Sequence, residues 1–114
     1  DSNMYRIRLA RAAGAPSSIA TLDTFDKTLF RSASYNVSIS DPSSGALGLY
    51  ETLDVNLTHD GTNVFLSSYG RTTNHTEDLV AFSADISGSD VRLRGTISNT
   101  NTHTVTVVRR LMKV

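Results

Sequence analysis

The fold of this chain is decided by residues 47–69, LGLYETLDVNLTHDGTNVFLSSY, where apolar and polar side chains alternate up to a polar interruption at residues 59–62. Leucine or valine occupies most odd positions from 47 to 57, and most even positions are polar. A period of two is typical of a strand with one buried face. An Asp-Gly pair between two such runs indicates a hairpin turn, because glycine adopts a positive φ at little cost. The stretch therefore predicts a β-hairpin with Gly61 at a positive φ.

Short alternating runs recur along the rest of the chain, separated by polar turns such as residues 41–45 and 87–90. Many short strands with polar turns predict an all-β domain, either an antiparallel β-sandwich or a jelly-roll-like barrel. We expect a short helical turn near residues 24–31, because Asp23 or Thr24 could cap it, or an irregular crossover in its place. The alternation assigns these residues to the core: Tyr35, Val37, Ile39, Leu53, Val55, Leu57, Val64, Leu66, Phe82, Val91, Leu93, Val105 and Val107.

Length and composition limit the classes of function. A chain of 114 residues fits one domain that needs no metal or disulfide, and it contains no cysteine. Eleven basic and eleven acidic residues cancel, so no net charge attracts nucleic acid or an anionic membrane. No apolar run approaches the roughly 20 residues of a membrane-spanning helix. We therefore expect neither a nucleic-acid nor a membrane partner, and a start at Asp1 is typical of a trimmed or excised segment.

Residues that could carry chemistry are few. His59, His75 and His103 lie in a predicted turn, a loop and a strand start, without the spacing of a zinc site, and we interpret them as solvated. No serine lies in a Gly-x-Ser-x-Gly elbow, and the aspartates of the predicted turns lack the spacing of a calcium loop. The sequence thus predicts no catalytic residue, no metal site, no cofactor and no enzymatic activity.

Aromatic residues flank the central hairpin at Tyr50, Phe65 and Tyr69. Exposed rings stack on sugars, which makes Tyr50 and Tyr69 candidate sugar-stacking residues. Tyrosine is also a common strand residue that buries its ring and keeps its hydroxyl wet. Packing in the core or against a neighbouring protein is the favoured interpretation, and sugar binding stays open as the alternative.

Positive charge is concentrated at the chain ends, and arginine strongly outnumbers lysine in the whole chain. Protein interfaces enrich arginine and deplete lysine, although a base-composition bias would give the same pattern. Charged ends also guard strand edges against aggregation. We favour contact with a partner that supplies acidic groups or carbonyls. The candidate assembly surface consists of Tyr5, Arg6, Arg8, Arg109, Arg110 and Lys113.

Five sequence blocks carry a resemblance to a known family: LDTFDKTLFRSASY at residues 22–35, THDGTNV at 58–64, SYG at 68–70, FSADISG at 82–88 and VRL at 91–93. In order and spacing this pattern resembles a domain that recurs in virion structural proteins of tailed phages, especially those infecting cyanobacteria. The resemblance covers about residues 19–111.

The resemblance implies a non-enzymatic component of the virion exterior, such as a head-decoration, neck or tail-fibre protein, assembled in the host cytoplasm. Its expected partners are other virion proteins and further copies of itself. We divide the chain into residues 1–18, an N-terminal strand with a linker or assembly arm, and residues 19–114, a β-sandwich virion domain. The alternative is a carbohydrate-binding module of a phage fibre that recognises a host surface glycan.

Overall fold

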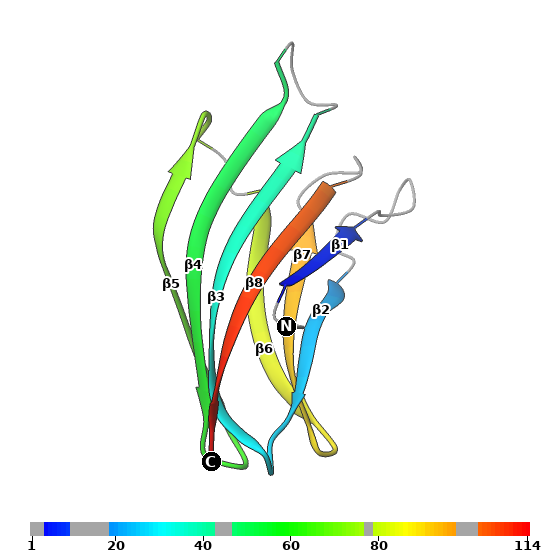
Figure 1. The fold of residues 1–114 in the computed structure, drawn as a ribbon. Coiled ribbons are helices and arrows are strands. Elements are labelled where there is room, and N and C mark those ends of the chain that lie inside the picture. Colours follow the sequence, from blue (N-terminus) through cyan, green and yellow to red (C-terminus); the bar gives the residue numbers. More distant parts are fainter. Residues whose placement is uncertain (1–3, 10–18, 43–46, 77–78, 98–102) are drawn as a thin grey trace.

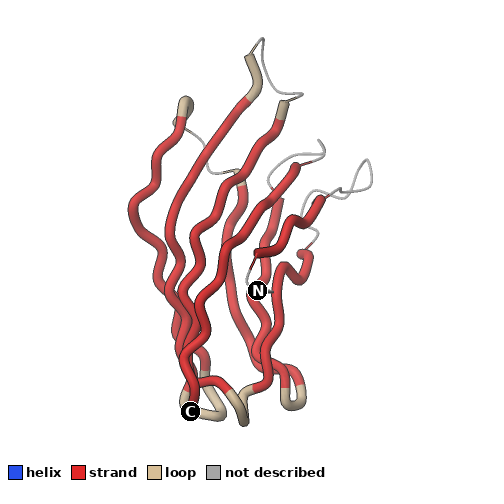
Figure 2. Tube along the Cα trace, in the orientation of Figure 1, coloured by secondary structure: helices blue, strands red, loops and turns tan. Residues whose placement is uncertain are grey.

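The computed structural model describes residues 4–9, 19–42, 47–76, 79–97 and 103–114. Eight strands and no helix occupy these residues, joined by short turns (Figures 1 and 2). The described residues contain no helix long and apolar enough to cross a membrane. The strands are β1 (Met4–Leu9), β2 (Ile19–Asp26), β3 (Phe30–Asp41), β4 (Leu49–His59), β5 (Val64–Thr73), β6 (Val80–Ser87), β7 (Asp90–Ile97) and β8 (His103–Lys113).

The strands form two antiparallel sheets that face each other in two layers (Figure 1). The larger sheet has the order β1-β8-β3-β4-β5, and the smaller sheet has the order β2-β7-β6. Neighbours in each sheet run antiparallel throughout. The predicted all-β antiparallel sandwich is therefore confirmed.

Side-chain alternation explains how the core forms between the sheets. Along β4 every second residue from Glu51 to His59 points inward and is buried, while the residues between them are more exposed. Most of the expected core residues are buried, but Val64, Leu66 and Phe82 are only partly so, because they lie on the edge strands β5 and β6. Buried apolar residues that the alternation did not single out are Leu22, Phe25, Ala33, Leu79, Val80 and Ile97.

The segment expected to form a helical turn is a strand followed by a tight corner. β2 continues to Asp26, and β3 begins at Phe30 in the other sheet. The Asp26 carboxylate accepts hydrogen bonds from the backbone N–H of Thr28 at 2.8 Å and from its hydroxyl at 2.7 Å. These bonds, led by the one from the hydroxyl, lower the pKa of Asp26. Asp26 and Thr28 thus close the corner, whereas Asp23, an expected helix cap, lies within β2 and is buried, as is Phe25.

The hairpin between β4 and β5 agrees with the prediction from its Asp-Gly pair. Gly61 has a φ of 97°. The Asp60 carboxylate accepts hydrogen bonds from the backbone N–H groups of Thr62 at 3.0 Å and Asn63 at 2.7 Å. These bonds lower the pKa of Asp60, with the bond from Asn63 contributing most. A positive φ at Gly61 and this local bonding together form the turn.

The N-terminal strand lies at the edge of the larger sheet. β1 pairs with β8 of the same chain, with Met4 opposite Val108 and Leu9 opposite His103. The expected linker falls outside the described residues. The division of the chain after residue 18 and an exchange of β1 with a neighbouring subunit both stay predictions.

Candidate functional site

The side of the larger sheet that points away from the core is the outer face, formed by outward side chains of β8, β3, β4 and β5. On β3, exposed Ser34, Asn36 and Ser38 alternate with buried residues such as Tyr35 and Val37. Strand alternation thus places a band of hydroxyl and amide groups on this face.

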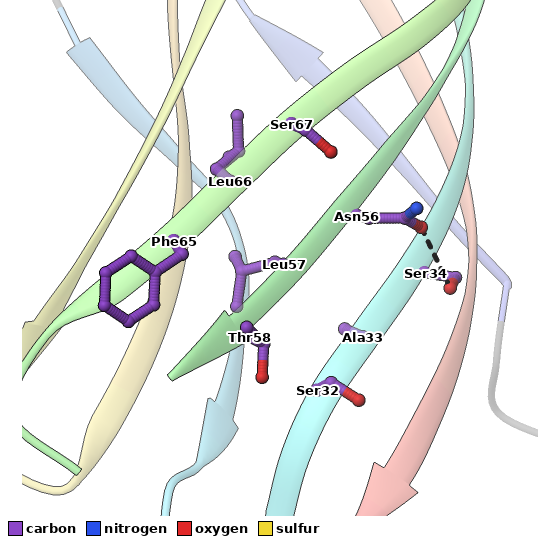
Figure 3. Close-up of a pocket in the computed structure, with 9 residues that line it drawn as sticks. All are labelled: Ser32, Ala33, Ser34, Asn56, Leu57, Thr58, Phe65, Leu66 and Ser67. Carbon is purple, nitrogen blue, oxygen red and sulfur yellow. Dashed lines mark hydrogen bonds between the residues drawn. The ribbon is translucent and has the colours of Figure 1, made fainter. Parts of the chain in front are cut away.

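The strand register aligns the polar side chains of the outer face in rows. One row crosses four strands, with Arg110 opposite Ser34, Ser34 opposite Asn56 and Asn56 opposite Ser67. The Ser34 hydroxyl donates a hydrogen bond to Asn56 Oδ1 at 3.1 Å, drawn as a dashed line in Figure 3. Each row therefore combines several hydrogen-bonding groups from different strands.

The next row holds Val108, Asn36, Asp54 and Tyr69 in the same order of strands. Asn36 Nδ2 donates a hydrogen bond to Asp54 Oδ1 at 3.0 Å. This bond holds the carboxylate of Asp54, the residue opposite Tyr69.

Three shallow hollows lie on the outer face, and each is lined by one exposed aromatic residue. Phe65 lines a hollow of about 380 Å³, together with the Ser34 and Asn56 pair (Figure 3). Tyr69 lines a hollow of about 250 Å³, and Tyr50 lines a third of about 380 Å³. The face thus repeats an exposed ring beside a hollow; the hollows of Phe65 and Tyr69 expose polar groups, and the hollow of Tyr50 is almost wholly apolar.

The three aromatic residues do not pack in the core. Tyr50 is 46% exposed, and Phe65 and Tyr69 are each 54% exposed. The core-packing part of the sequence interpretation is therefore wrong, and the ring faces are available for a partner or a ligand.

Two residues that the sequence did not single out position Tyr50. Asn74 Oδ1 accepts a hydrogen bond from the Tyr50 backbone N–H at 3.0 Å, and Asn74 Nδ2 donates to the Gly48 carbonyl at 3.2 Å. Gly48 has a φ of 81°, and a Cβ there would lie 2.8 Å from the Tyr50 hydroxyl oxygen. A Gly-x-Tyr sequence beside a turn is the only local signal of this arrangement, since the asparagine comes from a distant segment.

Arg109, expected on an assembly surface, faces the other sheet instead. Its Nη1 donates to the two carboxylate oxygens of Asp23 at 3.0 and 3.1 Å and to the Thr24 carbonyl at 3.2 Å. The Tyr35 hydroxyl donates to the same carboxylate at 2.8 Å. The Arg109 side chain is 14% exposed, and its charge links β8 to β2 across the sandwich. Its carboxylate partner in the opposite sheet explains why it turns inward.

The other residues of the candidate assembly surface are spread over β1 and β8. Tyr5, Arg6 and Arg8 lie on β1, with Tyr5 opposite Val107 and Arg8 opposite Thr104. Arg110 is exposed on β8, about 10 Å beyond Val107 and about 20 Å beyond Thr104. Lys113 lies beyond it at the other end of the strand, opposite Phe30. The structure therefore does not bring the two chain ends together into one compact charged cluster.

The histidines are structural groups rather than solvated ones. His59 is buried, its Nε2 lies 2.8 Å from the Phe30 carbonyl, and its Nδ1 accepts from the Gly61 N–H at 3.0 Å. His75 Nε2 lies 3.7 Å from a Glu51 carboxylate oxygen. His103 is fully buried, and its Nε2 lies 3.7 Å from an Asp41 carboxylate oxygen. In the part of the chain that the structure describes, no three acidic, histidine or cysteine residues gather where they could hold a metal ion.

Known proteins resemble this chain in structure but not in sequence. Neither a family model nor a curated protein matches the sequence. The tailspike protein of Acinetobacter phage vB_ApiP_P1 shares the fold with a TM-score of 0.60 and 14% identity, over 98% of this chain and 22% of that one.

Two further tailspikes match less well. That of Acinetobacter baumannii phage AM24 has a TM-score of 0.47 and 11% identity, over 96% of this chain and 26% of that one. That of A. baumannii phage Fri1, a capsular polysaccharide depolymerase, has a TM-score of 0.34 and 13% identity, over 98% of this chain and 20% of that one. The chain thus spans about a fifth to a quarter of each tailspike, and a fold like this sandwich occurs as one part of the longer protein of phage vB_ApiP_P1.

Proposed function

We propose that this chain is a structural domain of a tailed-phage tail component of the fibre or tailspike kind, and that it acts through protein–protein assembly without catalysing a reaction. The observation that carries the proposal is the fold shared with the vB_ApiP_P1 tailspike over 98% of this chain. A tailspike neighbour favours a place on the tail over the head or the neck. The cyanobacterial host implied by the sequence resemblance is not part of the proposal, because the similar structure that carries it comes from an Acinetobacter phage.

A non-enzymatic role is supported by how the structure uses its ionisable side chains. Arg109 pairs with Asp23 between the sheets, and Arg92 binds both carboxylate oxygens of Asp85, at 2.7 and 2.6 Å, on the smaller sheet. The pairing with Arg92 lowers the pKa of Asp85. These contacts tie strands together and use the charges for structure.

The proposed partners are other virion proteins and further copies of this chain, reached through β1 and the sheet edge that it forms. β1 is an edge strand, and Arg6 and Arg8 lie on it. Edge strands present unpaired backbone groups that a neighbouring chain can pair with.

Light scattering on the full chain and on a variant lacking residues 1–10 tests this assembly. We expect the full chain to form a multiple of its 12.3 kDa mass and the truncated chain to be a folded monomer. The double charge reversal Arg6→Glu/Arg8→Glu keeps β1 and should also reduce the assembled mass. The same mass for all three proteins, each with a β-sheet circular dichroism spectrum, contradicts the proposed assembly surface.

A second candidate function is recognition of a host surface glycan. It is favoured by the exposed rings of Tyr50, Phe65 and Tyr69, each beside a hollow of the outer face. A glycan microarray probed with the full chain tests it. Saturable binding that is lost in Tyr50→Ala or Tyr69→Ala supports recognition, and an array without binding contradicts it.

A further inference from the structure

We propose that the outer face binds one extended, carboxylate-bearing polysaccharide chain along β4 and β5. In this arrangement the rings of Phe65, Tyr69 and Tyr50 stack on sugars, and Arg110 binds a carboxylate. The inference rests on the second candidate function, glycan recognition, and is independent of assembly through β1. To glycan recognition it adds the length of the ligand, the sign of its charge and the residues that bind it.

The spacing of the rings indicates an extended ligand. Phe65 and Tyr69 lie on the same side of β5, four residues apart, which is about 13 Å along the strand. Tyr69 is opposite Asp54, and Tyr50 precedes Asp54 by four residues on β4, about another 13 Å. The three rings therefore follow one direction over about 27 Å, too far for a single sugar to contact all of them.

The surroundings of each ring suit a sugar. A pyranose presents an apolar face of C–H groups and a rim of hydroxyls, so it needs an aromatic surface with hydrogen-bonding groups beside it. The hollows of Phe65 and Tyr69 supply both, whereas the exposed lining of the Tyr50 hollow is almost wholly apolar. The volumes of the three hollows, 250 to 380 Å³, are near the lower end of the range for small-ligand clefts, about 300–1,000 Å³. A ring beside a hollow is thus repeated three times along the face, with exposed hydrogen-bonding groups at two of the three.

The rings and Arg110 are residue types that protein interfaces also enrich, and the residues between them favour a glycan over a protein as the occupant of this face. The cores of protein interfaces are depleted in serine and aspartate. The centre of the outer face instead carries Ser34, Ser38, Ser67 and Asp54, with Asn56 among them. A surface dominated by small hydroxyl and amide groups matches the hydroxyls of a polysaccharide better than the side chains of a protein.

The charge of the ligand follows from Arg110. This side chain is exposed, and none of the ion pairs among the described residues involves it. It lines the hollow of Tyr69 together with Asp54, whose carboxylate already accepts a hydrogen bond from Asn36 Nδ2 on the strand between them. The hydroxyl of Ser34, opposite Arg110, donates a hydrogen bond to Asn56 Oδ1, which leaves Asn56 Nδ2 as the donor of that side chain. A guanidinium with an amide donor nearby is the set of groups that binds a carboxylate through charge-assisted hydrogen bonds.

A microarray of acidic bacterial capsular polysaccharides, each printed beside its carboxyl-reduced form, tests the charge class. The full chain should bind at least one acidic polysaccharide and bind its reduced form about 10- to 100-fold more weakly, the loss of one charge-assisted hydrogen bond. Titration calorimetry with the bound polysaccharide should give the same loss for Arg110→Gln. Arg94→Gln, on β7 of the other sheet, is the charge-matched control and should bind as the wild type does.

The same titration tests the stacking residues. Phe65→Ala, Tyr69→Ala and Tyr50→Ala should each weaken binding, while Leu29→Ala, which removes an apolar side chain that is 58% exposed at the β2–β3 corner, should not. Oligosaccharides cut from the bound polysaccharide should gain affinity with length until they reach about 27 Å. Circular dichroism confirms that each variant folds.

Four results overturn the inference: no binding to any acidic polysaccharide, equal binding to the reduced form, binding unchanged by Arg110→Gln, or binding unchanged by all three ring variants. Glycan binding that survives carboxyl reduction removes the charge class and leaves the second candidate function standing. A failure to assemble in light scattering affects the first proposed function alone.

Discussion

The salt bridge between Arg109 and Asp23 offers a direct test of how the two sheets are held together. The change Arg109→Met keeps an unbranched apolar side chain in the sandwich and removes the guanidinium. It deletes the bonds to both Asp23 oxygens and to the Thr24 carbonyl, and leaves the Asp23 carboxylate with the Tyr35 hydroxyl as a donor. The Asp23 side chain is 6% exposed, so water cannot replace the lost charge fully.

The expected cost follows from this burial. Removing one partner of a buried pair costs about 3–5 kcal/mol, because the remaining charge stays uncompensated. The Arg109 side chain is 14% exposed, so some water reaches the site and the lower end, about 3 kcal/mol, applies. Tyr35→Phe removes a single hydrogen bond to Asp23 and should cost less, about 1–2 kcal/mol.

Urea denaturation followed by far-UV circular dichroism measures the effect, since the chain has no tryptophan to report by fluorescence. A loss of about 3 kcal/mol lowers the urea midpoint by about 1–3 M. Arg110→Met is the matched control, one residue along β8 and exposed, and should stay within about 0.5 kcal/mol of the wild type. The double variant Arg109→Met/Asp23→Leu should be more stable than Arg109→Met alone, because it removes the stranded charge.

Two results refute this reasoning. One is an Arg109→Met protein whose free energy of unfolding lies within about 0.5 kcal/mol of the wild-type value, as for a surface substitution. The other is a double variant destabilised by the full sum of its single changes, which would mean that the two side chains do not interact.

Three further predictions concern the central hairpin. Val55→Ala and Leu57→Ala, at fully or almost fully buried positions, should each lower the free energy of unfolding by about 1–4 kcal/mol, and wild-type urea midpoints for both would show that the core is misassigned. Gly61→Val should cost about 1 kcal/mol or more from backbone strain alone, because φ is 97° and a Cβ there meets no heavy atom within 4 Å; Gly61→Asn should cost less, and equal stability of all three proteins contradicts this. The pKa of Asp60 is lowered by the backbone N–H groups it binds, so its stabilisation is complete above the unfolded pKa, about 3.9, and is lost as the pH falls through the folded pKa. Asp60→Ala should therefore be less stable than the wild type in urea at pH 7 but nearly equal to it at pH 2, and an equal deficit at both pH values rules this out.

Local features of the sequence determined the strands and the central turn. In β4, Leu53, Val55 and Leu57 alternate with polar residues, and a period of two assigns them to one face whatever packs against it. Asp60 and Gly61 form their turn with bonds that stay within a few residues. These features depend on neighbours in the chain, and so the sequence alone predicts them.

Only the tertiary structure decided which strands are neighbours and which face of each strand is covered by the other sheet. β8 lies between β1 and β3, and this places Arg109 against Asp23, 86 residues away in sequence. β5 is the edge strand of the larger sheet, and residues 67–72 are exposed on both sides of it. Alternation assigns a side chain to one of two faces, but whether that face meets a second sheet or solvent depends on strand order. For this reason the sequence left open whether Tyr69 packs in the core, packs against a neighbouring protein or stacks on a sugar, and the structure places it on the outer face.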